Sequence, residues 1–305
     1  MSLGNNIRIG ISGWTYEPWK GKFYPEDLPA TKELEYASRQ FNSLEINGTF
    51  YALQKPATFA KWYQQTPEDF CFAVKANRYI THTKRAKEAR KPVAHFLTGA
   101  LCLKEKLGPI LWQFPPTMKL KDDRFDTFFE ILPRTVEEAI KLVQKENEFF
   151  PEFDEYLPSL KKLHKKPLQH AFEFRHESFF TPTFVENMAR QGVGLVLADS
   201  NGKWPYSEDV TANFVYVRLH GHGKIYEGGY PTPVLKEWTK KVRAWQEGKK
   251  WPHPQVLTKL LGEGVKKDVF VYFDNDAKVE APFNAKELTQ LVTKRRSTRV
   301  AKASA

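Results

Sequence analysis

Eight short apolar runs recur along the chain, and most of the intervals between them are long enough to hold a helix. The runs are rich in β-branched and aromatic residues, as buried strands are. We predict strands at residues 7–12, 43–47, 70–76, 109–114, 170–175, 193–198, 214–220 and 269–274. Helical patterns occupy residues 34–41, 56–65, 87–106, 125–131, 182–191, 234–246 and 285–294.

Strands that alternate with helices pair in parallel through right-handed crossovers, and eight such units close a barrel. We therefore predict an α/β fold, a single (β/α)₈ TIM-like barrel domain over residues 1–294. The rival arrangement is an open doubly wound sheet, but no glycine-rich phosphate turn follows the first strand. Charged helical patches at residues 135–149 and 152–166 predict an elaborated fourth βα unit. The basic tail, residues 295–305, is expected to be disordered.

Composition narrows the class of protein. The chain carries 47 Lys and Arg against 36 Asp and Glu, a formal net charge of +11. Such a charge favours anionic partners, although plain solubility explains it equally well. Cys71 and Cys102 are the two cysteines, and no C-x-x-C motif is present. Without a signal-like N-terminus or an apolar stretch of about 20 residues, we expect a cytoplasmic protein that makes no membrane contact.

In a barrel of this kind the residues that end each strand face one shared bowl, where active sites lie. Charges within otherwise apolar strands are costly unless they are paired or used. Five residues fit this description: Glu45, Lys75, Glu173, Arg175 and Arg218. They form either a salt-bridged layer inside the barrel or part of a functional site. Further polar and aromatic side chains follow the strands: Trp14, Tyr16, Asn47, Gln113, His176, Asp199, His220, Asn275 and, in a glycine-rich loop, Tyr226.

Several kinds of site lack support in the sequence. No H-E-x-x-H or other tight ligand spacing is present, and the cations of the bowl would repel a metal ion, so we expect no metal and no other cofactor. The loop G-H-G-K-I-Y-E-G-G matches neither the G-x-G-x-x-G spacing nor the Walker spacing of phosphate-binding loops. It resembles a flexible lid or an ordinary loop. No G-x-S-x-G motif marks a serine nucleophile.

Longer motifs resemble a known family. They are I-G-I-S-G-W-T-Y-E-P-W-K-G-K-F-Y-P, F-N-S-L-E-I-N-G-T-F-Y, F-A-V-K-A-N-R-Y-I-T-H, L-G-P-I-L-W-Q-F-P-P, E-F-R-H-E-S-F-F, Y-V-R-L-H-G and V-Y-F-D-N-D with A-P-F-N-A, spread over residues 7–291. The chain resembles the YecE-like family, which is catalogued as a domain of unknown function. The resemblance implies a TIM-like barrel, related in fold to sugar-isomerase and apurinic-endonuclease barrels, and no established reaction.

The family's motif positions fall on Trp14, Tyr16, Trp19, Glu45, Asn47, Lys75, His82, Gln113, Glu173, Arg175, His176, Asp199, Arg218, His220 and Asn275. This chain departs from the pattern at two of the motifs. Gly48 stands where serine is usual, and Asp274 stands where asparagine is common. The second departure adds a negative charge to the bowl.

Two hypotheses follow. In the first, the bowl binds a phosphate-bearing sugar or nucleotide-like ligand, for isomerase or phosphoester hydrolase chemistry. Cationic donors would hold the anion, carboxylates and histidines would move protons, and aromatic rings would stack on the ligand. The residues that would hold the anion are Lys75, Arg175 and Arg218. The candidates for acid and base are Glu45, Glu173, His220, His176 and Asp199. Trp14 and Tyr16 would stack on the ligand, and further contacts would come from Asn47, Gln113, Tyr226 and Asn275. The second hypothesis is a nucleic-acid binder whose positive surface follows the backbone.

One expectation concerns the two arginines. Arg175 and Arg218 lie two strands apart, and side chains from alternate strands share a layer in such barrels. Two guanidinium groups at such a short distance repel each other unless carboxylates or a bound anion lie between them. We expect a partly unsatisfied positive locus there, which a ligand anion would fill.

Overall fold

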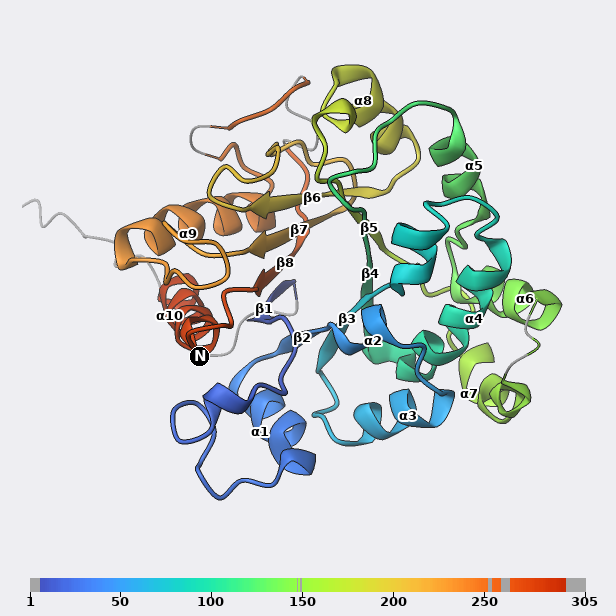
Figure 1. Ribbon diagram of the computed structural model, residues 1–305, viewed down its shortest axis with the longest axis horizontal. Coiled ribbons are helices and arrows are strands. Elements are labelled where there is room, and N and C mark those ends of the chain that lie inside the picture. Colours follow the sequence, from blue (N-terminus) through green and yellow to red (C-terminus); the bar gives the residue numbers. More distant parts are fainter. Residues whose placement is uncertain (1–5, 147, 149, 252–253, 259–263, 295–305) are drawn as a thin grey trace, which may run out of the picture.

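The computed structural model describes residues 6–146, 148, 150–251, 254–258 and 264–294. Its centre is one eight-stranded parallel sheet in the order β1-β8-β7-β6-β5-β4-β3-β2. The strands are β1 Ile7–Ile11, β2 Ser43–Ile46, β3 Cys71–Lys75, β4 Leu107–Gln113, β5 His170–Glu173, β6 Gly194–Asp199, β7 Phe214–Leu219 and β8 Asp268–Phe273. Figure 1 looks down this ring of strands, with the helices around its outside. The predicted barrel is confirmed, and each predicted strand is present.

The barrel has one weak seam, between β1 and β2. Within the described chain no continuous ladder joins these two strands: the Ser12–Glu45 bridge and the hydrogen bond from Gly13 N to Glu45 O (2.8 Å) are supplemented by side-chain bonds, such as that from Ile9 N to Asn42 Oδ1 (3.0 Å). Gly10 makes the close approach possible, because a Cβ there would lie 1.8 Å from the carbonyl oxygen of Ser43. No other residue type fits that position without opening the seam.

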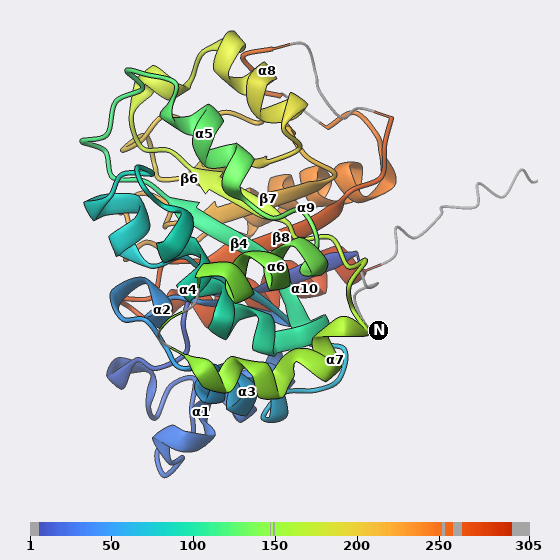
Figure 2. The same ribbon diagram turned by 90° about the vertical axis from the view of Figure 1, so that its right-hand side faces the viewer.

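Helices form the outer layer. They are α1 Glu33–Gln40, α2 Gly48–Tyr51, α3 Pro56–Gln64, α4 Arg90–Ala100, α5 Arg124–Ile131, α6 Val136–Glu146, α7 Leu157–Lys161, α8 Pro182–Arg190, α9 Thr232–Glu247 and α10 Glu280–Thr293. Helices α5, α6 and α7 all belong to the connection from β4 to β5, as the expected elaborated unit requires, and Figure 2 views the barrel from their side.

The helix expected over residues 87–106 is divided. Only Arg90–Ala100 is α-helical, and the turn Leu101–Lys106 follows it. Left-handed backbone at Glu88 (φ 45°) and Lys104 (φ 53°) ends regular helix on either side, because such angles cannot continue an α-helix. The tail at residues 295–305 lies outside the described residues.

The inside of the barrel changes character along its axis. Alternate residues of β7 face inward, and they run from Phe214 through Tyr216 to Arg218. Alanines that face inward from other strands of the barrel leave room for these large side chains: Ala73, Ala171 and Ala198. The interior is therefore apolar at the N-terminal ends of the strands, phenolic in the middle and ionic at the C-terminal ends.

The described residues also include no helix that is both long enough and apolar enough to cross a membrane.

Candidate functional site

Arg218 lies at the centre of a buried ionic cluster. Its side chain has no exposed surface, and its donors meet three carboxylates from three other strand ends. Nε and Nη2 lie 3.1 and 2.8 Å from the two carboxylate oxygens of Glu45. Nη1 donates to Glu173 (2.7 Å), and Nη2 lies 3.1 Å from Oδ2 of Asp274. One guanidinium thus ties β2, β5 and the end of β8 to β7.

The Glu45 carboxylate is fully used by protein donors. Its Oε1 accepts from Ser12 Oγ at 2.8 Å, and its Oε2 accepts from Tyr216 Oη at 2.6 Å, in addition to the two bonds from Arg218. Burial and the Glu45 charge raise the pKa of the Tyr216 hydroxyl well above its ordinary value, so this donor keeps its proton. A carboxylate with four donors anchors the cluster and has little capacity left to move a proton.

Glu173 joins the two arginines. Its Oε1 accepts from Arg175 Nε (2.6 Å), and its Oε2 accepts from Arg218 Nη1 (2.7 Å). Burial alone would raise the pKa of Glu173, but the two guanidiniums lower it well below its ordinary value. Glu173 is therefore a permanent anion at neutral pH.

The expected positive locus needs correction at Arg218. The carboxylate of Glu173 lies between the two arginines, and Glu45 and Asp274 occupy further Arg218 donors. The contacts favour a structural role for Arg218, since little of its hydrogen-bonding capacity is left for a ligand anion.

Asp274, which directly follows β8, completes the cluster. Its Oδ2 lies 3.1 Å from Arg218 and 2.8 Å from Nδ1 of His220. Burial opposes its ionisation, but Arg218 and His220 hold the pKa of Asp274 below its ordinary value. The other ring nitrogen of buried His220, Nε2, has no hydrogen-bond partner in the described chain. His220 thus retains unused hydrogen-bonding capacity beside a fixed anion.

Lys75 is the second group with unused capacity. The side chain is 9% exposed, and Nζ lies 4.3 Å from the centre of the Phe50 ring. Within the described residues this ammonium has no hydrogen bond or ion pair, although Glu173, Asp274 and Glu45 all act on it electrostatically. Burial, with the charge of Arg218, lowers the pKa of Lys75 to about 8.

Arg175 lies flat on an indole. Its guanidinium carbon is 3.6 Å from the centre of the Trp204 ring, and Nε is held by Glu173. Its two Nη groups have no hydrogen-bond partner among the described residues. A stacked and oriented guanidinium with free Nη groups is well suited to an anion.

Two more titratable side chains border the cluster. His82 packs edge-on against Phe50, with ring centres 5.0 Å apart. Burial, together with the charges of Lys75 and Arg175, lowers the pKa of His82 to about 4, so its imidazole is neutral at pH 7. Burial and the charge of Asp274 raise the pKa of Asp276 to about 6.

Some predicted site residues lie close to this cluster. Tyr16 donates to Ser12 O (2.7 Å), and burial together with the charges of Asp276 and Asp274 raises the pKa of its hydroxyl. Tyr226 packs edge-on against His220, with ring centres 5.7 Å apart. Gln113, in register with Glu173, is buried and donates to Phe114 O. Asn47 begins α2, and its buried Oδ1 has no partner in the described chain.

Four other predicted residues have local contacts elsewhere. Asp199 accepts from Tyr230 Oη (3.1 Å) and lines a separate pocket of about 390 Å³ beside α9. The Trp14 ring packs on Trp62 of α3 at 5.5 Å. His176 caps a short turn by accepting from the Ser178 backbone. Asn275 joins the loop after β7 to α10 by donating to Gly228 O and Asn284 Oδ1 (both 3.0 Å).

The described side chains form no cluster suited to a metal ion. No group of three or more His, Cys, Asp or Glu in the described part of the chain is placed to hold an ion. The carboxylates that do converge are held by guanidinium.

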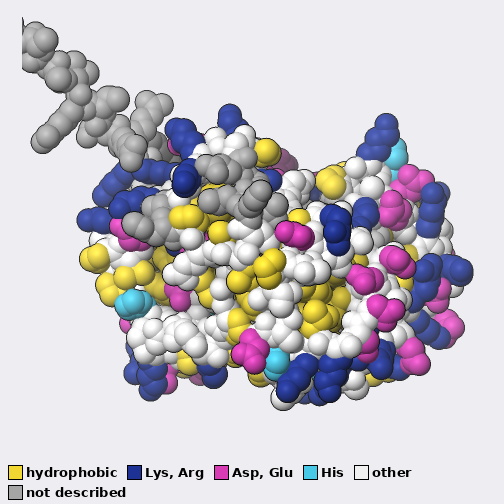
Figure 3. Space-filling view, turned by 90° about the horizontal axis from the view of Figure 1, so that it is seen from above, with side chains coloured by type: hydrophobic (Ala, Val, Ile, Leu, Met, Phe, Trp, Pro, Cys, Tyr) yellow, Lys and Arg dark blue, Asp and Glu magenta, His cyan; other side chains and the backbone are white. Residues whose placement is uncertain are grey.

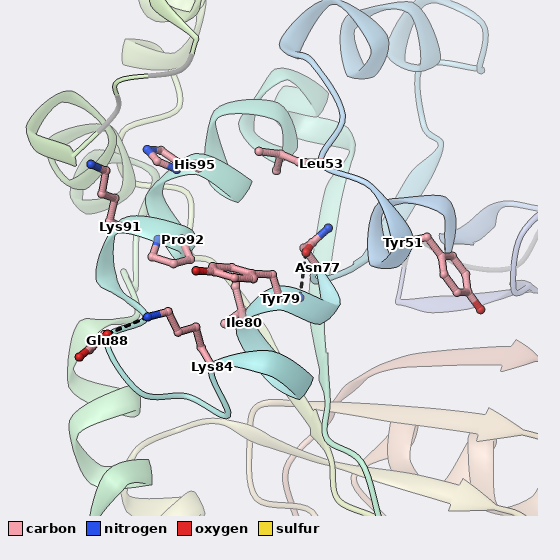
Figure 4. Close-up of a pocket in the computed structure, with 10 residues that line it drawn as sticks. All are labelled: Tyr51, Leu53, Asn77, Tyr79, Ile80, Lys84, Glu88, Lys91, Pro92 and His95. Atoms are coloured by element: carbon pink, nitrogen blue, oxygen red, sulfur yellow. Dashed lines mark hydrogen bonds and ion pairs between the residues drawn. The ribbon is translucent and has the colours of Figure 1, made fainter.

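A cavity of about 600 Å³ lies beside the end of β3 (Figure 4). Its apolar lining includes Tyr79, which lies next to Pro92 in the close-up, and Ile80. The lysines at its edge are already paired: Lys84 with Glu88 at 2.7 Å, and Lys91 with Glu148 at 2.6 Å. This cavity therefore lacks the unpaired cations found at Lys75 and Arg175.

Comparison with known proteins assigns the family. A sequence model described as "Protein of unknown function DUF72" matches residues 8–305. The chain belongs to the DUF72 family. The UPF0759 protein YunF of Bacillus subtilis (strain 168) is 27% identical over 306 residues, covering 94% of each protein. The UPF0759 protein YecE of Escherichia coli (strain K12) is 35% identical over 111 residues, which cover 36% of this chain and 38% of that protein.

Solved structures of DUF72 proteins share the fold. A DUF72 family protein from Thermotoga maritima MSB8 has a TM-score of 0.67 at 24% identity, covering 94% of this chain and 99% of that chain. One from Enterococcus faecalis V583 has a TM-score of 0.62 at 18% identity, covering 95% and 96%. The family resemblance seen in the motifs is thereby confirmed.

Proposed function

We propose that this DUF72 barrel binds a phosphate-bearing sugar or nucleotide-like ligand at the C-terminal ends of its strands and carries out acid–base chemistry on it. The observation that carries the proposal is a contrast within one cluster. The polar atoms of Glu45, Glu173 and Arg218 are hydrogen-bonded within the cluster, whereas Arg175 and Lys75 keep unpaired donors.

Arg175 supports the anionic part of the proposal. Stacking on Trp204 and the bond to Glu173 fix its plane before a ligand arrives, so little side-chain entropy is lost on binding. Arginine whose orientation is fixed recognises phosphate by parallel N–H donors. In this arrangement Arg175 holds the phosphate, while Arg218 holds the floor of the site.

His220 and His82 support the chemical part. His220 keeps an unused Nε2 while its Nδ1 faces Asp274, and His82 is neutral at pH 7. An imidazole with a free ring nitrogen beside a fixed carboxylate can exchange a proton with a bound ligand. We assign general acid–base work to the histidines, with the carboxylates as electrostatic supports.

The test is thermal unfolding and calorimetric titration with ribose 5-phosphate, with ribose and inorganic phosphate as separate arms. A ligand that binds only the folded state stabilises it by RT ln(1 + [L]/Kd). Ribose 5-phosphate should stabilise the wild type, and Arg175→Met should lose at least about tenfold in affinity, roughly 1.4 kcal/mol.

The matched control is Arg39→Met on α1, where an exposed arginine pairs only with Glu35. This variant should keep the full response. Equal stabilisation by chloride at the same ionic strength, or an unchanged response in Arg175→Met, would refute the proposal, because simple screening acts on every charge alike.

Nucleic acid is the competing ligand class. Figure 3 shows Lys and Arg side chains interspersed with Asp and Glu over the face in view, without one continuous basic band. A small phosphorylated ligand gives a shallow dependence of log affinity on log salt, whereas a duplex contacting six or more phosphates gives a slope steeper than about −5. A steep slope with an oligonucleotide, without binding of ribose 5-phosphate, would favour the competitor.

A further inference from the structure

The backbone of Lys75 is hydrogen-bonded on both sides, whereas its side-chain amine has no acceptor among the described residues. Its carbonyl oxygen accepts from Thr49 Oγ1 (2.6 Å), and its position in β3 pairs with Leu111 of β4. The Nζ atom, by contrast, lies over the Phe50 ring without a hydrogen bond in the described chain. The fold thus fixes where this amine lies and gives it no acceptor.

Another buried lysine of the same chain shows what a structural lysine looks like. Lys106 is 4% exposed, and its Nζ donates to Tyr63 O (2.6 Å), Thr66 O (2.8 Å) and Thr66 Oγ1 (3.2 Å). Its three donors therefore match three acceptors. Burying an ammonium without such partners is costly, so an unpaired one marks a site where a function compensates for the cost.

We infer that Lys75 is a nucleophile that forms an imine with the carbonyl carbon of the bound ligand. The inference rests on the proposed function and narrows its ligand to open-chain phosphorylated aldehydes or ketones. Arg175 would hold the phosphate, which leaves Lys75 for the carbonyl end.

The electron and proton balance is simple. The lone pair of the neutral amine attacks the carbonyl carbon, and the C=O π pair moves to oxygen, which takes up a proton. The nitrogen then loses a proton to water, and the carbinolamine expels its hydroxyl as water with a second proton. This leaves a protonated imine, which loses its N–H proton to give the neutral imine. The C=N bond that remains consumes one carbonyl and releases one water, with no oxidant or reductant.

The surroundings supply the conditions for this step. Burial lowers the pKa of Lys75 to about 8. An ordinary lysine has a pKa of about 10.4, so near pH 7 the neutral fraction at Lys75 is on the order of a hundredfold larger.

Hydride trapping tests the inference on the full-length protein. The protein is incubated with dihydroxyacetone phosphate and sodium cyanoborohydride at pH 7.5, and modified lysines are identified by peptide mass spectrometry. Lys75 should be labelled at least about tenfold faster than exposed lysines, given its larger neutral fraction. Dihydroxyacetone without phosphate should label it more slowly, and excess ribose 5-phosphate should compete.

Two variants complete the test. Lys75→Arg keeps the positive charge and removes the nucleophile, so the fast phase of labelling should disappear. Lys106→Arg should leave labelling of Lys75 unchanged. If either variant fails to fold, the site map of the wild type still decides, because it needs no substitution.

The outcomes separate the inference from the proposed function. Labelling spread over surface lysines, with Lys75 no faster, overturns the inference even if ribose 5-phosphate still stabilises the protein through Arg175. Absence of both labelling and stabilisation overturns both proposals. Fast labelling of Lys75 that phosphate compounds cannot compete away overturns the link between the imine and a phosphorylated ligand.

Discussion

Replacing Arg218 by methionine should destabilise the barrel severely without changing its architecture. Methionine fills much of the same volume but leaves Glu45, Glu173 and Asp274 without their common counter-ion. Removing one partner of a buried ion pair costs about 3–5 kcal/mol.

Three carboxylates are affected, yet the loss should stay within that range rather than triple. Each carboxylate keeps at least one other partner: Ser12 and Tyr216 on Glu45, Arg175 on Glu173 and His220 near Asp274. Domains are typically stable by about 5–15 kcal/mol, so the variant should fold with a much smaller margin.

The assay is urea denaturation at pH 7 and pH 5, followed by tryptophan fluorescence and circular dichroism. In the wild type, the pKa values of Glu173 and Asp274 are lowered, so their contribution is present at neutral pH and is lost as the solution is acidified. In Arg218→Met these values should rise above the unfolded values of about 4, so their contribution should decrease as the pH rises from 5 to 7.

Partial rescue should follow from Arg218→Met/Glu45→Gln, which removes one of the stranded charges. A urea midpoint at pH 7 within experimental error of the wild type would refute the reasoning. So would a variant that is destabilised equally at both pH values, because the loss would then be one of packing.

Three further predictions concern single positions. Gly10→Ala should cost at least about 3 kcal/mol in chemical denaturation, because its Cβ would overlap Ser43 O and force the β1–β2 seam open; a loss under 1 kcal/mol would contradict this. Tyr216→Phe removes the 2.6 Å bond to Glu45 and should cost about 1.5–3 kcal/mol, and an unchanged urea midpoint would count against the bond. The raised pKa of Asp276, about 6, destabilises the fold as the pH rises from about 4 to 6. Asp276→Asn should remove that part of the pH dependence, and an unaltered profile would show that another group is responsible.

Much of the architecture could be predicted from the sequence because strand periodicity is local. Each predicted strand appears within a few residues of its expected bounds, and β7 shows why the bowl could be anticipated. Phe214, Tyr216 and Arg218 alternate with outward residues, so a charge at Arg218 had to enter the barrel. The same argument could have placed Asp199 correctly, since Val196 and Ala198 face inward and Asp199 has the opposite parity.

The partnerships within the site could not be predicted from the sequence. Nothing local to Lys75 indicates that its amine has no acceptor while the amine of Lys106 has three, because those acceptors come from a different segment, Tyr63 and Thr66. Trp204 is separated from Arg175 by 29 positions in the chain, so their stacking is likewise a tertiary contact. Unused polar capacity becomes visible only when all the neighbours are in place.

The members of the buried ionic cluster around Arg218 are synthesised at different times. Glu45 and Glu173 are synthesised before Arg218, and Asp274 follows more than fifty residues later. A nascent chain that has completed β5 holds two acids intended for the interior, whose shared counter-ion has not yet been made. Closing the interior at that stage would bury Glu45 without a cationic partner and leave Glu173 with Arg175 alone. We therefore expect the barrel to close late in its biosynthesis, after β7 has supplied Arg218.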